Sequence, residues 1–390
     1  MSNIKELLEG VEVEWKSLNE VILSLKTGLN PRQNFKLNTQ DSEGYYVTVR
    51  EIQNGKIVFS EKTDRVNTQA LKTINNRSNL EVGDVLFTGT GTVGRIAVVE
   101  IKPENWNIKE GVYVIKPISK LLNPKYLAHL LSSSFMIKEF SLKVVGSPVI
   151  SLPMSELKKL QIPIPPLHIQ SEIVRILDNF TELTAELTAE LTAELTARKK
   201  QYTYYRDKLL TFEDGEVEFK ALGKVAKIKN GKDWKNLGEG DVPVYGSGGI
   251  MKYVNTSTYN KPSVLIPRKG SLGNLFYVDT PFWNVDTIFY TEIDDSQIVP
   301  KFFYYFLTTI GLAEMNQAGG VPSQTQAALN TIKVPIPPLE EQQKIVATLD
   351  KFDTLTNSIS EGLPKEIELR TKQYEYYRDL LLTFPKKAEI

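Results

Sequence analysis

The sequence contains no cysteine and only two histidines, His129 and His168. Without cysteine there can be no disulfide, thiolate zinc site or cysteine nucleophile, and two imidazoles are too few for a histidine-rich metal site. No apolar run is long enough for a membrane-spanning helix. The opening residues also lack the basic and apolar regions of a signal peptide. We therefore expect a cytoplasmic protein without a metal site or a membrane partner.

An excess of either charge is missing too, because 47 basic side chains balance 47 acidic ones. The distribution along the chain is uneven. Residues 16–161 contain 20 basic and 13 acidic side chains, and residues 220–333 contain 12 and 9. The remaining segments are acidic. Two mildly basic regions alternate with acidic ones, so the neutral average does not exclude a nucleic-acid partner.

What the sequence does have is an internal repeat at a constant offset of 172 residues. Self-similarity at a fixed spacing is typical of a chain built from repeated structural units. The matched blocks are IPIPPL and VPIPPL (162–167 and 334–339), QSEIVRILDNF and QQKIVATLDKF (170–180 and 342–352), and RKKQYTYYRDKLLTF and RTKQYEYYRDLLLTF (198–212 and 370–384). The segment EVEWKSL at 12–18 likewise resembles EVEFKAL at 216–222. The chain therefore begins part-way through its repeat.

Each copy of the repeat predicts a long helix after a double proline, because apolar residues follow at spacings of three and four. The first helix can span about 45 residues, whereas Gly362 and Pro364 should kink or restart the second. Matching apolar ladders predict an antiparallel pair with a coiled-coil-like seam. The ladder residues are Leu183, Leu187, Leu191, Leu195, Leu355, Ile359, Leu363 and Ile367.

The first ladder contains a strict tetrapeptide repeat, TAELTAELTAEL, at residues 184–195. Four residues do not match the 3.6-residue turn of a helix, so a leucine stripe drifts by about 40° per copy. Taken alone, the repeat is equally well explained as a tolerated DNA expansion. The second copy of the chain keeps the apolar positions with a different sequence, which favours a structural element.

The regions between the helices predict an α+β fold, with two mixed α/β domains joined by two long antiparallel helices in a pseudo-two-fold repeat. Apolar runs such as VLFT, VYVIK, VLIP and TIFYTEI predict strands. The expected regions are an N-terminal segment at 1–15, a first globular domain at 16–161, a central helical spacer at 162–215, a second globular domain at 216–333 and a C-terminal helical region at 334–390.

Two short motifs resemble cofactor or catalytic signatures without fitting them. Gly89, Gly91 and Gly94 have dinucleotide-binding spacing, but a predicted strand follows instead of the helix N-terminus that binds a pyrophosphate. A glycine-rich hairpin turn is the better interpretation. Asn123-Pro124-Lys125-Tyr126 lacks the second proline of the Asn-Pro-Pro-aromatic motif of adenine methyltransferases, and a proline at the start of a helix explains it. We therefore predict no catalytic residues.

The repeated blocks, with the tetrapeptide repeat between them, resemble the specificity subunit of type I restriction-modification systems along essentially the whole chain. The central TAEL copies resemble the type IC branch. The resemblance implies a non-catalytic subunit in which two target-recognition domains each read one half of a split double-stranded DNA site, while the helices set the spacer. Two modification subunits dock on the helices and form an adenine-N6 DNA methyltransferase, and two restriction subunits can add an ATP-driven nuclease for phage defence. S-adenosylmethionine, ATP and magnesium are implied for those partners, and no cofactor for this chain.

Within this family picture, glycine-rich loops with small polar and basic side chains suit contacts to phosphates and base edges. The residues predicted to contact DNA are Arg95, Ser147, Lys229, Lys232, Ser247, Arg268, Lys269, Ser271 and Gln324. The candidates for docking the modification subunits are Tyr202, Tyr204, Tyr205, Tyr374, Tyr376 and Tyr377. Two alternatives stay open: a stand-alone methyltransferase, and a helical scaffold that spaces two protein-binding domains without DNA.

Overall fold

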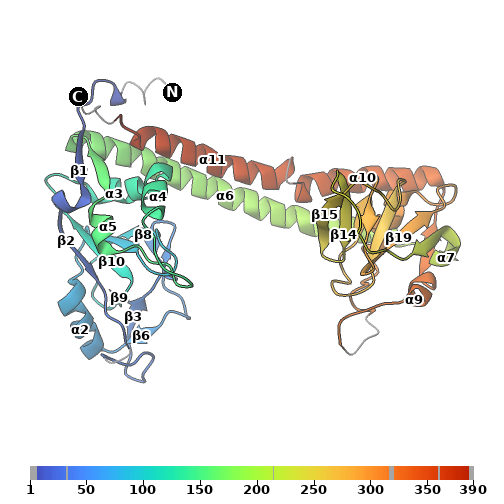
Figure 1. Ribbon diagram of the computed structural model, residues 1–390, viewed down its shortest axis with the longest axis horizontal. Helices are drawn as coiled ribbons and strands as arrows, with labels where there is room; N and C mark the ends of the chain where they lie inside the picture. The colour runs from blue at the N-terminus through green and yellow to red at the C-terminus, as the bar shows by residue number, and fades with distance from the viewer. Residues whose placement is uncertain (1–6, 32–33, 214, 316–319, 359–360, 386–390) are drawn as a thin grey trace. The chain divides into compact units, whose positions relative to one another are not determined.

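The computed structural model describes residues 7–31, 34–213, 215–315, 320–358 and 361–385 (Figure 1). The chain folds into two compact units. Unit 1 comprises Met1–Ala189 and Glu368–Ile390, and unit 2 comprises Glu190–Ile367. Within the described ranges, every helix is too short or too polar to cross a membrane.

Unit 1 is built around a four-stranded antiparallel sheet in the order β2-β10-β7-β8. A second sheet, β6-β3-β9, contains the parallel pair β3 and β9, and β1 pairs with β11. The strands are β1 (Glu14–Ser17), β2 (Ile22–Thr27), β3 (Gly44–Val47), β4 (Ile52–Gln53), β5 (Lys56–Ile57), β6 (Arg65–Val66), β7 (Val85–Thr88), β8 (Ile96–Val98), β9 (Trp106–Ile108), β10 (Val112–Pro117) and β11 (Gln161–Ile164). The helices are α2 (Thr68–Ser78), α3 (Pro124–Leu131), α4 (Ser134–Ser141) and α5 (Met154–Lys158).

Unit 2 repeats this plan. Its four-stranded sheet has the order β13-β19-β16-β17, its three-stranded sheet β15-β14-β18 contains the parallel pair β14 and β18, and β12 pairs with β20. The strands are β12 (Glu218–Ala221), β13 (Ala226–Lys229), β14 (Val242–Gly246), β15 (Gly249–Val254), β16 (Ser263–Pro267), β17 (Phe276–Val278), β18 (Trp283–Asn284), β19 (Ile288–Ile293) and β20 (Lys333–Ile336). The helices are α7 (Leu222–Val225), α8 (Pro300–Leu307) and α9 (Gln326–Asn330). The predicted mixed α/β pair of domains is therefore confirmed.

The central strands of both four-stranded sheets are buried on both faces. In β7, Val85 and Phe87 join one apolar cluster, whereas Leu86 joins another on the opposite face. In β16, Val264 and Leu265 divide in the same way. Successive strand residues point to opposite faces, so a strand covered on both sides needs an unbroken apolar run. This explains why these strands were recognisable in the sequence.

The long helices are α6 (Leu167–Leu210), which is 44 residues long, α10 (Leu339–Asn357) and α11 (Gly362–Leu382). In unit 1, α11 runs antiparallel to the first part of α6. The Phe180 and Tyr377 rings stack with centroids 5.4 Å apart, and the Thr181 hydroxyl donates to the Tyr374 hydroxyl at 3.0 Å. In unit 2, Tyr202 and Tyr205 of α6 pack against Phe352 of α10.

The second helical region is interrupted where the sequence predicts a break. Gly362 has φ +77°, and a Cβ there would lie 2.5 Å from the Thr354 carbonyl oxygen. Any other residue would therefore be strained in its backbone and clash with the end of α10. Among the ladder residues, Leu183 is 51% exposed and Leu363 is buried, and Leu187, Leu191, Leu195, Leu355 and Ile367 are partly buried. Ile359 lies outside the described residues.

Asp178 of α6 and Asp350 of α10 occupy equivalent positions, and each fixes its helix to the adjoining globular domain. Asp178 of α6 accepts hydrogen bonds from His129 Nε2 at 2.8 Å and Lys125 Nζ at 3.0 Å. These bonds, that from His129 first, lower the pKa of Asp178. In unit 2 the equivalent Asp350 accepts from the Tyr305 hydroxyl at 2.5 Å and from Lys301 at 2.9 Å.

We expect Asp350→Ala to lower the free energy of unfolding by about 2 kcal/mol, because the Tyr305 hydroxyl would lose a charged acceptor at a buried site. Tyr305 is 1% exposed. Denaturant unfolding of the full chain measures the loss. Asp353→Ala is the matched control on the same helix, since Asp353 accepts a hydrogen bond from Asn357 of α10 itself. Equal effects of the two substitutions would contradict the assignment of Asp350 as an anchor.

Candidate nucleic-acid interface

Three segments that are distant in sequence meet in unit 2. The turn at 267–274 follows β16, and its Arg268 and Lys269 amides donate to the Thr287 carbonyl at 2.8 and 3.2 Å. The Gly270 amide donates to Pro322 at 2.9 Å, and Lys269 forms an antiparallel bridge with Ser323. We call the segments 267–274, 285–287 and 320–324 the unit 2 loop cluster.

The hairpin between β14 and β15 adjoins this cluster. The Ser247 amide donates to the Thr287 hydroxyl at 3.4 Å, and the Ser247 carbonyl accepts from Asn274 Nδ2 at 3.1 Å. The structure thus brings together Ser247, Arg268, Lys269 and Ser271, four of the residues predicted to contact DNA. Of these, Lys269 and Ser271 are exposed.

The remaining basic candidates of unit 2 lie beside the cluster. The exposed Lys232 is held through its backbone amide, which donates to the Asn284 carbonyl at 2.9 Å. Lys229 instead forms an ion pair with Glu292 at 3.5 Å. The Arg268 guanidinium lies 5.8 Å from the centre of the Phe289 ring, an arrangement that suits a cation–π contact and holds the side chain at the surface of the sheet.

Gln324 was predicted to contact DNA, but its side chain is buried inside the unit 2 loop cluster. It is 3% exposed, its amide nitrogen donates to the Pro267 carbonyl at 2.5 Å, and its backbone amide donates to the Arg268 carbonyl at 3.0 Å. A side chain so deeply buried cannot touch DNA in this conformation. Gln324 therefore holds the turn at 267–274 in position, and the exposed residues of that turn are the better contact candidates.

Unit 1 contains an equivalent cluster made of the segments 88–95, 109–111 and 145–151, the unit 1 loop cluster. The Gly89 amide donates to the Gly111 carbonyl at 2.7 Å, and the Gly91 amide donates to Ile150 at 2.9 Å. The glycine-rich segment is a turn between β7 and β8, as predicted. Ser147 is exposed in this cluster. Arg95 donates to the Val49 carbonyl at 2.9 Å, so its guanidinium is partly committed to the protein backbone.

The two clusters have equivalent backbone hydrogen bonds but present different side chains. The bond from Leu152 to the Gly89 carbonyl corresponds to that from Gln324 to Arg268, and the bond from Gly91 to Ile150 corresponds to that from Gly270 to Pro322. At matched positions, the turn reads Gly-Thr-Gly-Thr in unit 1 and Arg-Lys-Gly-Ser in unit 2. A common scaffold therefore presents two different chemical surfaces.

The sequence interpretation missed a Trp-Asn pair that recurs beside each cluster, at Trp106-Asn107 in β9 and Trp283-Asn284 in β18. Both asparagines are buried. Asn284 donates to the Ile288 carbonyl at 2.8 Å, and Asn107 accepts from the Ser78 hydroxyl at 2.7 Å. The identical dipeptide preceding an apolar strand in each half was the available signal.

The tyrosines predicted to dock a partner divide into two groups. Tyr204 and Tyr376, which are 172 residues apart, are 60% and 59% exposed. Tyr205 is 38% exposed and stacks on Phe352, and the partly buried Tyr202, Tyr374 and Tyr377 contact neighbouring helices. An open hollow of about 550 Å³ lies beside Tyr204 and is lined by Asp207, Lys208, Thr211, Glu213 and Glu216.

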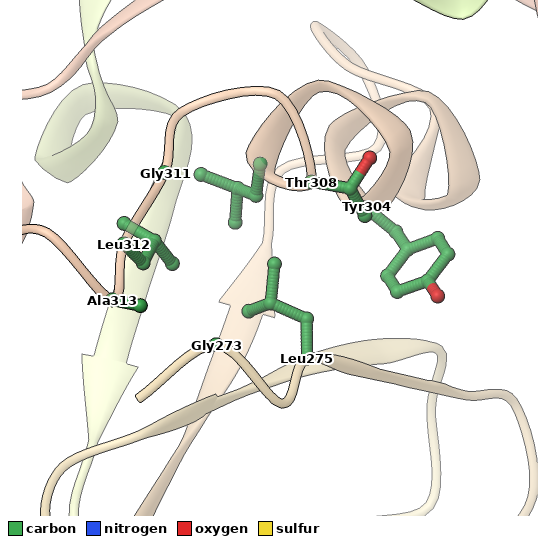
Figure 2. Close-up of a pocket in the computed structure, with 8 residues that line it drawn as sticks. Gly273, Leu275, Tyr304, Thr308, Gly311, Leu312 and Ala313 are labelled. Atoms are coloured by element: carbon green, nitrogen blue, oxygen red, sulfur yellow. The ribbon is translucent and has the colours of Figure 1, made fainter. Parts of the chain in front are cut away.

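A smaller apolar cavity of about 190 Å³ lies in unit 2 between the turn after β16 and α8 (Figure 2). Leu275, Tyr304 and Leu312 line it. In unit 1 the ring of Phe140 packs against Gly94, where a Cβ would lie 2.9 Å from it, whereas Gly273 at the matched position faces Ala313. The cavity is therefore a packing difference between the units. In the described part of the chain, no group of three or more acidic or imidazole side chains is arranged to hold a metal ion.

Comparison with known proteins extends over both units. A family model described as "Type I restriction modification DNA specificity domain" matches residues 10–197 and again residues 214–369. The chain is 33% identical to the Type I restriction enzyme EcoR124I/EcoR124II specificity subunit of Escherichia coli, with 100% of this chain and 99% of that protein covered. It is also 33% identical to the putative specificity subunit S.HindORF215P of Haemophilus influenzae, with 98% of each chain covered.

Solved structures show the same fold. A chain from work on complex assembly and conformational transition of the type I R-M system has a TM-score of 0.70 at 19% identity, covering 95% of this chain and 97% of that one. The type I S subunit from M. genitalium has a TM-score of 0.51 at 21% identity, covering 97% and 98%.

Proposed function

The chain belongs to the family of type I restriction-modification specificity subunits, the non-catalytic members of these systems, and on that premise we propose that each unit reads one half of a split DNA site. The observation that supports this proposal is the duplicated loop cluster. The two clusters keep the same backbone hydrogen bonds while they present different side chains. Base edges are read by side chains on a fixed backbone, so two such surfaces suit two different half-sequences.

The surface chemistry of the clusters supports base reading rather than phosphate binding alone. Lys269 and Ser271 in unit 2 and Ser147 in unit 1 are exposed, and the two globular regions are only mildly basic. A protein that depended on its own phosphate contacts would need more cationic surface. In our proposal, partner subunits supply part of that contact.

We further propose that α6 and its partner helices set the distance between the half-sites. One tetrapeptide adds about 6 Å to a helix, compared with about 3.4 Å per base pair. One copy should therefore correspond to one or two base pairs. A spacer of about 6–8 pairs would place the half-site centres roughly one helical turn of DNA apart. On the basis of the central TAEL copies, we also propose that the chain belongs to the type IC branch of the family.

The partners in this proposal are two modification subunits, to which two restriction subunits can be added. The modification subunits would bring S-adenosylmethionine and methylate adenine at N6, and the restriction subunits would bring ATP and magnesium chemistry. Exposed tyrosines are frequent anchors in protein interfaces, and Tyr204 and Tyr376 occupy equivalent positions. We therefore assign one docking site to each.

Tyr204→Ala and Tyr376→Ala should each weaken binding of one modification subunit about 30-fold, because a buried tyrosine anchor contributes about 2 kcal/mol. Native mass spectrometry of the purified complex should then show one modification subunit per chain in each single variant, and none in the double variant. Thr203→Ala, at an exposed neighbour of Tyr204, is the control. Retention of both subunits in the double variant would rule these tyrosines out as anchors.

Selection from a random duplex library tests the proposed function. The purified chain with its modification subunits should enrich duplexes with two fixed half-sequences separated by an unspecified spacer. If the chain is instead a scaffold that spaces two protein-binding domains, no DNA sequence should be enriched. A chain that methylates DNA without any modification subunit would support the stand-alone methyltransferase instead.

A further inference from the structure

Each loop cluster exposes an apolar side chain at the same place. Val149 in unit 1 is 61% exposed, and Val321 in unit 2 is 69% exposed. Each valine precedes the residue whose carbonyl accepts the amide of the turn glycine, which is Ile150 for Gly91 and Pro322 for Gly270, both at 2.9 Å. The two valines are therefore structurally equivalent.

A single exposed valine on a protein surface needs no explanation. Here the exposure occurs twice at matched positions, on loops that backbone hydrogen bonds hold against the turns. In unit 1 it extends to Val145, which is 55% exposed, and Ile150, which is 42% exposed. A repeated apolar surface on a loop held by backbone hydrogen bonds indicates a contact made with a partner.

The neighbours of these valines indicate the chemistry of that partner. In unit 2, the exposed cation Lys269 bridges to Ser323. The exposed carboxylate Asp286 precedes Thr287, whose carbonyl accepts from the same turn. In unit 1, the exposed Glu110 stands in the matching position before Gly111.

A surface that binds only phosphate would exclude carboxylates, because they repel the DNA backbone. A mixture of hydrogen-bond donors, acceptors and apolar groups instead matches base edges in the major groove. Those edges display acceptors, amino donors and the methyl group of thymine. The isopropyl group of valine has no hydrogen-bonding capacity, so the thymine methyl is the feature that it complements.

We propose that Val149 and Val321 make apolar contacts with base edges in the major groove, one valine in each half-site. This inference rests on the proposed function and adds a non-ionic component of specificity to it. Contacts of this kind contribute to affinity without releasing counterions from the DNA.

The test measures binding of the complex with modification subunits to its selected duplex over a range of salt concentrations. Val149→Ser and Val321→Ser should each raise Kd about tenfold, and each should relax base preference in a different half-site. The slope of log Kd against log salt should stay unchanged, whereas Lys269→Ala should reduce it by about one. Leu23→Ser, at a 71% exposed position of β2, is the matched control and should bind as the unmodified complex does.

Two results would overturn the inference alone. Kd values within twofold of the unmodified complex would show that the valines do not touch the bases. Loss of a modification subunit from either variant would instead assign the valine to a protein interface. Failure of the unmodified complex to select any split site would overturn the proposed function and this inference together. Thermal unfolding of each variant confirms that binding, and not folding, has changed.

Discussion

Deletion of Thr188–Leu191 should abolish methylation at the original DNA site and create methylation at a site whose spacer is one or two base pairs shorter. The deletion removes one turn of α6 and about 6 Å of helix length, and both half-sequences should stay the same because no loop cluster is altered. The deletion should also rotate the two ends of α6 relative to each other by about 40°, because four residues exceed one helical turn. The spacer of the new site must fit both the shorter distance and this rotation.

The matched control keeps the length and changes the sequence. Thr188→Ser combined with Glu190→Gln retains four helix-forming residues and Leu191, so the spacer should stay as it is in the unmodified protein. Base-resolution methylation mapping in cells that also make the modification subunit measures both variants. An unchanged spacer in the deletion variant would show that the repeat is tolerated filler and that another contact sets the distance.

Transfer of the unit 1 turn into unit 2 should change one half of the recognised site. The triple variant Arg268→Gly, Lys269→Thr and Ser271→Thr gives the turn of unit 2 the side chains of its counterpart. The backbone hydrogen bonds of this turn are common to both units, so we expect folding to be retained. If these side chains read bases as we propose, loss of the two cations should reduce discrimination in one half-site about 100-fold.

The unaltered half-site serves as the internal control for this variant. Its base preference should persist, because unit 1 is untouched. Binding of the complex to duplexes with single base changes in either half gives the comparison. Equal relaxation of both halves would show that the turn contributes only non-specific affinity, and an unchanged preference would exclude the turn from base reading.

The sequence predicted the helices and the central strands well because the signals for them are local. Double prolines immediately precede α6 and α10, and Gly362 interrupts the second helical region. Buried central strands such as β7 have unbroken apolar runs. Each of these signals depends on backbone geometry or on periodicity over a few residues. The antiparallel pairing followed because the same apolar positions recur 172 residues later.

The candidate site was only partly predictable because it assembles from segments distant in sequence. Glycine and small polar residues identified the loops in the sequence. They did not show which loops lie side by side in the folded chain. Nothing local distinguishes the buried Gln324 from the exposed Lys269, since both lie in polar segments. In the same way, the spacing of the tyrosines could not separate Tyr204, which is exposed, from Tyr202, which packs on Phe352. These outcomes depend on tertiary contacts.

Base-resolution methylation mapping of the intact chain with its modification subunit tests whether the two units read two halves of one DNA site. We expect methylated adenines in one motif made of two fixed half-sequences with an unspecified spacer of about 6–8 base pairs. Methylation at a single continuous motif, or the absence of any motif, would contradict the claim that the two units read two halves of one site.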